Sequence, residues 1–478
     1  MLTDIRVLET DVYVSRETAR ESLKFGNVIV DNCLYCHARV TVENARGHVA
    51  DGWGAIFLMD MWGWPSAAVS HVDREVALQR VTEAFAQNLS RSRDYAHPLS
   101  VFMEAERDLP AIAGSVAGGL GAQESIPPLA ALISASPLDM ALHDAFGNVN
   151  GIHTYQGYGP EFMRFDLGAY LGPGFKGRYI SDYLISAATP RLPVFHLVGG
   201  LDQIHKDELT GADDDLPRSL EDWIERDGLF CFKVKLRGND LSWDLERFLH
   251  VVTVVRELAT IVPCPPVFSV DTNEQCESAE YIVEFLRRLA EQDAPAFDAL
   301  LYVEQPVTRN LAANPHDMRA VARLKPVILD EGLASLQDFD LALTLGWSGI
   351  ALKTCKCHSK DLLFVCLAEQ RGIPYTVQDL TNPGLALLHS VGFAARTHPL
   401  VGVETNSRQY FPATSAAEAS VHPDIFSVKE GFVRTDSLYG SGFGFRTDEI
   451  PRPIFRSSHS RPRGSDVRVD GRDSLRLE

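Results

Sequence analysis

The second half of this chain repeats one pattern, in which a short apolar run stops on a charged residue and a helical segment follows. Near-continuous apolar strands that alternate with helices are typical of a parallel sheet covered by helices. Eight such runs favour a closed β/α barrel over an open sheet. The predicted strands cover residues 192–198, 231–236, 267–271, 300–304, 327–330, 349–353, 375–378 and 401–406, and the predicted helices include 242–260, 278–292, 336–345, 359–371 and 383–397.

The first 150 residues show a different order, with strands before helices. One predicted helix, over 136–146, takes Ser136 as its N-cap and Pro137 as its first residue. Strands followed by helices indicate a separate α+β domain. We therefore predict an α+β capping domain over 1–150, a modified (β/α)8 TIM-type barrel over 190–408, a segment over about 410–455 that packs against the cap, and a polar tail over 456–478.

The charge balance excludes some classes of partner. The net charge is −19 and the sequence pI is near 5.2, whereas nucleic-acid phosphates require clustered Lys and Arg. No run reaches the roughly 18 apolar residues of a membrane helix, and the N-terminus lacks a basic segment followed by an apolar one. The eight cysteines lie mostly inside apolar runs and fit reduced thiols. We therefore expect a cytoplasmic protein that binds neither nucleic acid nor membrane.

Three carboxylates end successive predicted strands, at Asp271, Glu304 and Asp330. In a β/α barrel the carboxyl ends of the strands meet at one face, where catalytic groups lie. Unpaired carboxylates would repel one another there, and a divalent cation would resolve the repulsion. An all-oxygen set favours Mg²⁺ over zinc, with Asn273 and Glu331 as supporting or alternative ligands. The alternative is that each acid caps its own loop.

Lysines end two other predicted strands. Lys233 and Lys235 point to one face of their strand because side chains alternate, and Lys353 ends a strand on the other side of the barrel. Neighbouring cations lower the pKa of a lysine and produce a neutral amine that acts as a general base. Lys233 would contribute to this shift and pair with a substrate anion. The alternatives are a solvated surface strand and, for Lys353, a solvated loop.

A metal with two opposed bases suits the removal of a proton next to a carboxylate, since the metal holds the charge of the enediolate. The same intermediate serves a racemase or epimerase of a carboxylic acid, a dehydratase of acid sugars, or a cycloisomerase. A barrel that only binds a ligand is a more distant alternative. The partner in each case is a small-molecule carboxylate.

The order Lys-x-Lys, Asp, Glu, Asp, Lys on consecutive strand ends resembles the enolase superfamily, in the mandelate racemase/muconate lactonising enzyme family and closest to its muconate lactonising branch. The cap and the glycine-rich stretch 440–444 are similar to that family's. The resemblance implies a (β/α)7β barrel and a homo-oligomer, either dimer or octamer. It also implies Mg²⁺ on Asp271, Glu304 and Asp330, with Lys235 and Lys353 as the acid/base pair and Lys233 assisting.

Departures from the family pattern bear on the substrate. The seventh strand has no histidine, unlike the mandelate racemase branch, and the eighth ends in Glu404-Thr405-Asn406 without the Asp-x-Asp of dipeptide epimerases. Glu404, if protonated, would hydrogen-bond a substrate carboxylate, and Asn273 is a second candidate for substrate binding. Trp53 opens an aromatic stretch, 53–65, that is either core or a loop closing over a ligand, and we take Trp53 as a third candidate.

Overall fold

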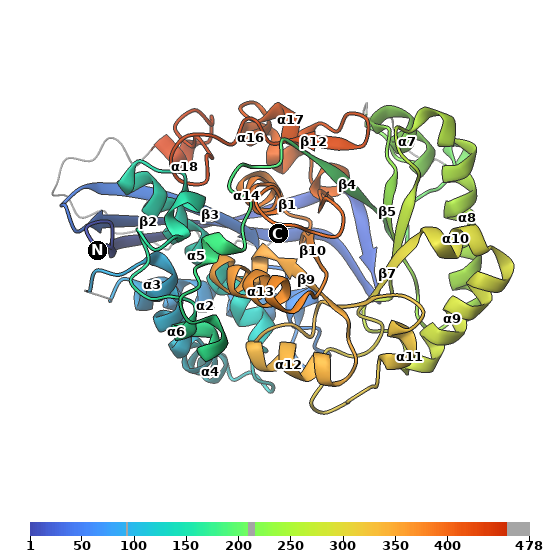
Figure 1. Ribbon diagram of the computed structural model, residues 1–478, viewed down its shortest axis with the longest axis horizontal. Coiled ribbons are helices and arrows are strands. Elements are labelled where there is room, and N and C mark those ends of the chain that lie inside the picture. The colour runs from blue at the N-terminus through green and yellow to red at the C-terminus, as the bar shows by residue number, and fades with distance from the viewer. Residues whose placement is uncertain (92–93, 209–215, 457–478) are drawn as a thin grey trace, which may run out of the picture.

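Eight parallel strands close into a barrel in the computed structural model, which describes residues 1–91, 94–208 and 216–456 (Figure 1). The strands pair in chain order and β11 pairs back with β4, so all eight carboxyl ends surround one mouth. The predicted barrel is therefore confirmed. Its strands are β4 (Arg191–Val198), β5 (Cys231–Lys235), β6 (Val267–Asp271), β7 (Leu300–Glu304), β8 (Val327–Leu329), β9 (Gly349–Lys353), β10 (Tyr375–Gln378) and β11 (Val403–Glu404).

Helices follow the strands and cover the outside of the barrel (Figure 1). Their apolar residues recur at helical spacing, as in α9, where Ile282, Phe285 and Leu289 are buried. Capping side chains fix where they begin, as in α12, where the Ser335 hydroxyl accepts from the Asp338 N–H. The helices are α7 (Leu220–Asp227), α8 (Leu241–Glu257), α9 (Ala279–Gln292), α10 (Ala294–Ala299), α11 (Arg319–Ala322), α12 (Leu336–Thr344), α13 (His358–Arg371), α14 (Gly384–Ala394) and α15 (Ser407–Tyr410).

A three-stranded antiparallel sheet with helices on it forms the cap, at the left of Figure 1. The sheet packs closely on α5, because a Cβ at Gly54 would lie only 2.0 Å from the carbonyl oxygen of Pro137. Only glycine fits such an approach. The elements are β1 (Ile5–Phe25), β2 (Val28–Asn44), β3 (Val49–Phe57), α1 (Asp60–Gly63), α2 (His71–Leu89), α3 (Pro98–Ala105), α4 (Leu109–Leu120) and α5 (Pro128–Asn150).

The predicted start of the helix at Ser136 is wrong. Helix α5 begins at Pro128, and Pro137 lies inside it. A proline within a helix has no N–H for the carbonyl four residues earlier, here that of Ile133. The Ser136 hydroxyl donates to that carbonyl over 2.9 Å, so the residue that we took for a cap repairs the helix instead.

The segment after β11 contacts both the barrel and the cap. Strand β12 (Phe432–Arg434) pairs antiparallel with β4. Further on, the Phe443 N–H donates to Asp144 of α5 over 2.8 Å, and the ring of Phe455 packs on Trp53 with centroids 4.8 Å apart. Of the predicted tail, residues 457–478 lie outside the described residues. The remaining helices are α6 (Gly168–Leu171), α16 (Ala416–Ala419), α17 (Pro423–Phe426) and α18 (Pro453–Arg456).

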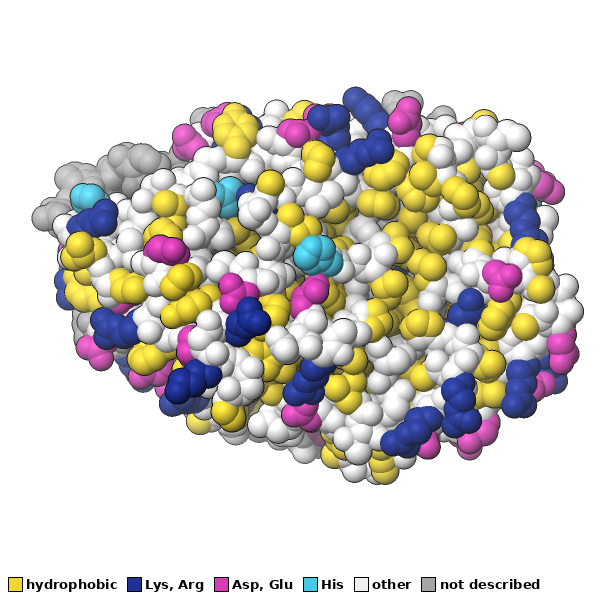
Figure 2. Space-filling model, in the orientation of Figure 1, with side chains coloured by type: hydrophobic (Ala, Val, Ile, Leu, Met, Phe, Trp, Pro, Cys, Tyr) yellow, Lys and Arg dark blue, Asp and Glu magenta, His cyan; other side chains and the backbone are white. Residues whose placement is uncertain are grey.

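The distribution of charge on the surface and the state of the cysteines agree with the expectations from composition. On the face that Figure 2 shows, acidic and basic side chains are interspersed, and no large basic patch stands out. Within the described residues, no helix has both the length and the apolar character to cross a membrane. All eight cysteines are free thiols, and Cys33 and Cys36 of the Cys-x-x-Cys-His stretch are buried in β2.

Candidate active site

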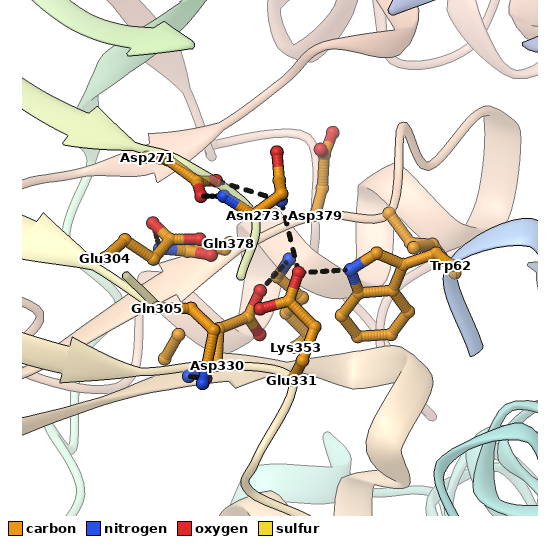
Figure 3. Close-up of polar contacts among 12 residues, drawn as sticks. Trp62, Asp271, Asn273, Glu304, Gln305, Asp330, Glu331, Lys353, Gln378 and Asp379 are labelled. Carbon is orange, nitrogen blue, oxygen red and sulfur yellow. Dashed lines mark hydrogen bonds and ion pairs between the residues drawn. The ribbon is translucent and has the colours of Figure 1, made fainter. Parts of the chain in front are cut away.

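Charged side chains from several strands meet at the mouth of the barrel (Figure 3). Lys235, Asp271 and Glu304 stand in register at the ends of β5, β6 and β7, Asp330 follows β8, and Lys353 ends β9. Three strands separate β5 from β9 in either direction around the closed barrel. Lys235 and Lys353 therefore reach the same cavity from opposite walls.

Lys233 is buried among three carboxylates. Its Nζ lies 2.7 Å from Glu304 Oε1, 3.0 Å from Glu404 Oε1 and 3.3 Å from Asp271 Oδ2. Gln378 donates to the other oxygen of Glu304 over 2.6 Å. Burial opposes the ammonium charge, but the three carboxylates outweigh it and raise the pKa of Lys233 well above its usual value.

Lys235 is held by groups from the neighbouring strand. Its Nζ lies 2.5 Å from Asp271 Oδ2 and 2.8 Å from Asn273 Oδ1. Burial pushes the pKa of Asp271 upward, but the charges of Lys235 and Lys233 prevail and hold it at about 2. Asp271 is therefore an anion at neutral pH.

Asp330 divides its carboxylate between two lysines. Its Oδ2 lies 2.6 Å from Lys353 Nζ, and its Oδ1 lies 2.9 Å from Lys356 Nζ. Lys356 also donates to the Asp330 carbonyl over 2.6 Å. Burial works against the charge on Lys353, but Asp330 and the acids beyond it raise the pKa of Lys353 above its usual value.

The direction of these lysine shifts corrects the sequence analysis. We expected neighbouring cations to lower the pKa of the lysines, but among the protein groups alone the pKa values of Lys233 and Lys353 are raised. The reason is distance, because each ammonium lies within 3 Å of at least one carboxylate oxygen. A lysine that acts as a base here needs part of that negative charge to be engaged elsewhere.

The mouth buries six carboxyl groups and four lysines, so with every group ionised the negative excess would be two, the charge of one divalent cation. The donor set is all oxygen, as Mg²⁺ prefers. The Oε2 atom of Glu331 is buried without a hydrogen-bond partner, and a buried polar atom of this kind fits contact with a cation. The charged groups are six carboxylates, at Asp271, Glu304, Asp330, Glu331, Asp379 and Glu404, and four lysines, at 233, 235, 353 and 356.

The three predicted metal ligands have suitable donor atoms and lie at one mouth, but their carboxylates are too far apart to hold one cation together. Across the described ranges, their carboxylate oxygens do not all lie within 4.8 Å of one another. The lysines explain this, because Lys233 lies between Glu304 and Asp271 while Asp330 is drawn to Lys353. A cation at this place would require the three side chains to turn away from the lysines.

A second group of metal-ligating side chains does meet that distance, in the cap. Asp60, His71 and Glu75 have ligand atoms within 4.8 Å of one another. Guanidinium groups already neutralise both acids, because Arg74 lies 2.9 Å from Asp60 and Arg16 lies 2.7 Å from Glu75. The cluster is therefore an ion-pair network within the cap rather than a place where a cation is needed.

The cavity between the cap and the barrel mouth has a volume of about 40 Å³. At its barrel side Glu404 accepts from Asn406 over 3.1 Å, and burial together with Glu404 raises the pKa of Asp379 to about 7. Asn273 and Thr381 adopt positive φ angles of 44° and 56°, which is uncommon for residues with side chains. The lining residues are Leu23, Phe25, Met59, Trp62, Leu197, Lys233, Lys235, Asn273, Lys353, Asp379, Leu380, Thr381, Glu404 and Asn406.

Two of the three predicted substrate-binding residues line this cavity. Glu404 and Asn273 line it, but Trp53 does not. The ring of Trp53 packs between Tyr13 and Phe455, at centroid distances of 6.0 and 4.8 Å. Trp62 lines the cavity instead, so the aromatic stretch supplies both core and covering. Sequence reasoning marked the stretch, but periodicity alone does not say which tryptophan faces inward.

Trp62 contacts the charged groups directly (Figure 3). Its indole N–H donates to Glu331 Oε1 over 2.9 Å, and Asn273 donates to the same oxygen over 3.1 Å. The Lys353 ammonium lies 4.6 Å from the centre of the indole ring, a cation–π contact. The cap thereby touches one of the two candidate acid/base lysines.

Comparisons with known proteins agree with this architecture. The family model described as enolase C-terminal domain-like matches residues 215–450. Solved structures match over nearly the whole chain, whereas no curated protein sequence gives a significant match. The family match therefore covers most of the barrel, including every charged residue of the mouth.

Three similar structures illustrate the match, and at their low identity they show the fold. Muconate lactonizing enzyme from Mucobacterium smegmatis, complexed with muconolactone, is 19% identical, covers 92% of this chain and 96% of its own, and has a TM-score of 0.58. An enolase from Bradyrhizobium, complexed with magnesium and mandelic acid, is 17% identical, with 93% and 96% covered and a TM-score of 0.56. N-succinyl Arg/Lys racemase from Bacillus cereus is 16% identical, with 93% and 97% covered and a TM-score of 0.54. Residues 215–450 therefore match the enolase C-terminal domain-like family, and the chain as a whole has the fold of solved mandelate racemase/muconate lactonizing enzyme proteins.

Proposed function

We propose that this enzyme removes the proton α to the carboxylate of a small-molecule acid. The observation that carries the proposal is the placement of Lys235 and Lys353, whose strands lie on opposite walls of one buried cavity. A planar carbon between them would have one lysine at each face. Lys235 would take the proton from one face, and Lys353 would return a proton to the other.

Mg²⁺ on Asp271, Glu304 and Asp330 is the second part of the proposal, supported by the excess of two carboxyl groups over lysines at the mouth. When bound, Mg²⁺ supplies positive charge where negative charge develops on the substrate carboxylate. Binding of the cation would also affect Lys353, whose Nζ lies 2.6 Å from Asp330 Oδ2. Once that oxygen is engaged elsewhere, Lys353 loses its nearest anion and can exchange its proton more readily.

Racemisation or epimerisation is the outcome that two opposed lysines support best. The same intermediate, on a substrate with a leaving group, would give a dehydratase or a cycloisomerase. Solved proteins of this fold include both a racemase and a muconate lactonizing enzyme. The substrate's β-substituent would decide between these outcomes. The homo-oligomer expected from the resemblance stays a prediction.

Proton exchange in D₂O tests the proposal. The enzyme is incubated with Mg²⁺ and a panel of hydroxy acids, acid sugars and N-acylated amino acids, and α-deuteration is followed by NMR, with EDTA as the control. Deuterium uptake with interconversion of enantiomers would establish a racemase, whereas uptake with loss of water or ring closure would establish a lyase or cycloisomerase. Uptake that persists undiminished in EDTA would contradict the metal.

A further inference from the structure

Resting on the function proposed above, we infer that the substrate carries a compact, uncharged, apolar substituent, and that Trp62 is the residue that sets this limit. The inference comes from the cavity's two unlike surfaces and from the way that Trp62 is fixed between them. It concerns the part of the substrate that lies away from the reacting carboxylate.

One surface of the cavity is apolar. Six of the lining side chains are aliphatic, aromatic or thioether groups, and only the indole N–H of Trp62 among these six is polar. That N–H is already engaged by Glu331. Substrate hydroxyls placed against this surface would therefore lack hydrogen-bond partners, at a cost of about 1–3 kcal/mol for each. The apolar surface consists of Leu23, Phe25, Met59, Trp62, Leu197 and Leu380.

The charged groups that line the cavity already have partners. Each of the three lysines lies against a carboxylate of the barrel. Asp379 accepts from the N–H groups of Thr381 and Asn406, over 3.0 and 2.9 Å, and Glu404 is held by Lys233 and Asn406. Among the described residues that line the cavity there is no arginine. A second carboxylate or a phosphate on the substrate would find no cation that lacks a carboxylate partner, and an ammonium would lie beside three lysines.

Trp62 is held from both of its ends. Its indole N–H donates to Glu331, and its carbonyl accepts from Arg309 Nη1 over 2.8 Å. Arg309 is in turn fixed by Glu274, whose two oxygens each lie 2.9 Å from its Nε. The centre of the ring lies 4.6 Å from the Lys353 ammonium. Moving the indole would break several of these contacts, so its face is a rigid wall of the cavity.

The size of the cavity supports a compact substituent. A volume of about 40 Å³ is small, so little space remains beside the indole for a bulky group. Removal of the indole would enlarge the space directly beside Lys353. The acids accepted by the wild-type enzyme should therefore carry groups near the size of methyl or isopropyl, and bulkier ones should enter only when Trp62 is truncated.

Rates of α-deuteration on a matched panel test the inference. The panel contains N-acetylated amino acids with methyl, isopropyl and benzyl side chains, and counterparts of similar size that carry a carboxylate, an ammonium or hydroxyls. We expect the wild-type enzyme to favour the methyl and isopropyl compounds. Trp62→Ala should shift the kcat/KM ratio toward the benzyl compound by at least about tenfold, and Trp62→Phe should shift it less.

Trp64→Phe is the matched control, because Trp64 is equally buried two residues away and does not line the cavity. It should leave the ratio unchanged. A wild-type preference for charged or hydroxylated acids, or an unaltered ratio in Trp62→Ala, would overturn the inference and leave proton abstraction standing. If no compound exchanges, calorimetric binding of the same panel with Mg²⁺ separates the two ideas. Preferential binding of the compact apolar acids would then support the ligand class and overturn the proposed function, and binding without preference would overturn both.

Discussion

The barrel mouth and the contact between cap and barrel bury polar groups in opposite ways. The mouth holds more carboxyl groups than lysines, as described above. The contact, which we call the seam, holds a chain of neutral side chains that connects α5 of the cap with α13 and α14 of the barrel. The seam consists of Asp139, Ser359, His143, Tyr158, His358 and His389, with Asp139 as the acid at one end.

The hydrogen bonds of the seam run in one direction. The Ser359 hydroxyl donates to Asp139 over 2.7 Å, so His143 Nε2 must donate to Ser359, at 2.8 Å. Tyr158 then donates to His143 Nδ1 and accepts from His358 Nε2, both at 2.8 Å. His389 begins the chain, with Nε2 3.0 Å from His358 and Nδ1 without a partner. Every link is satisfied by neutral imidazoles.

The difference indicates that the seam holds the two domains together and that the mouth binds a ligand. Burial lowers the pKa of His143 and His358 well below the usual value and that of His389 to about 3, so the seam carries its hydrogen bonds without cationic charge. A connected network without cationic charge fixes one arrangement of two domains. Buried lysines and carboxylates that do not cancel are costly, and such groups gather where a ligand completes them. Four experiments sharpen this comparison.

Removal of a mouth lysine should have the largest effect, and it should fall on activity. Lys235→Ala or Lys353→Ala should lower the α-exchange rate by about 10²–10⁴-fold, because each removes a group that takes or returns the proton. Exchange is measured by NMR, and circular dichroism checks that the variant folds. Lys176→Ala, at an exposed position, is the control. Full activity of the Lys235 variant would refute the proposed mechanism.

Acid should weaken the seam. A histidine whose pKa is lowered by folding stabilises the protein above its unfolded pKa of about 6.5, and this stability is lost as the pH falls below that value. Burial raises the pKa of Asp139 to about 7, which acts in the opposite sense. Between pH 6 and 5 the residues of the seam should therefore take up about two protons on unfolding. The free energy of unfolding should then fall by about 2.7 kcal/mol for each pH unit toward acid.

Urea unfolding as a function of pH measures this uptake. His389→Gln should reduce the slope of the unfolding free energy against pH by about one proton. His48→Gln, at an exposed position, should leave the slope as it is. An identical slope in the His389 variant and the wild type would show that His389 does not stay neutral in the fold.

Lys356→Met should destabilise the protein by about 3–5 kcal/mol, because it leaves Asp330 Oδ1 and the Asp330 carbonyl buried without their shared donor. The free energy of unfolding from urea titration is the measurement. Addition of Mg²⁺ should recover part of the loss if Asp330 binds the cation. A variant as stable as the wild type would mean that the mouth does not need this ion pair.

Tyr158→Phe should have the smallest effect of the four, about 1–3 kcal/mol, because it removes one hydroxyl and leaves one acceptor and one donor of the seam unpaired. Thermal unfolding measures the change, and Tyr439→Phe, at a site where the tyrosine is 57% exposed, is the control. Loss of exchange activity without loss of stability would show that the seam acts on the chemistry as well.

The barrel could be predicted because each of its strands can be identified from a short segment of the sequence. Each strand is a continuous apolar run with its own terminal charge, so the period and the ends could be seen in single segments. Helix α5 shows the limit. Ser136-Pro137 has the composition of a helix start, and local rules cannot tell that start from a proline inside a longer helix whose free carbonyl the serine repairs.

The sequence by itself determined which residue types end which strands, and in a parallel barrel that order places Lys235, Asp271, Glu304, Asp330 and Lys353 around one mouth. Only the tertiary structure decided their partners. Trp62 rather than Trp53 faces the cavity, Lys356 shares Asp330, and three histidines far apart in the chain form one network. These outcomes depend on distances between segments, which the linear order of residues does not contain.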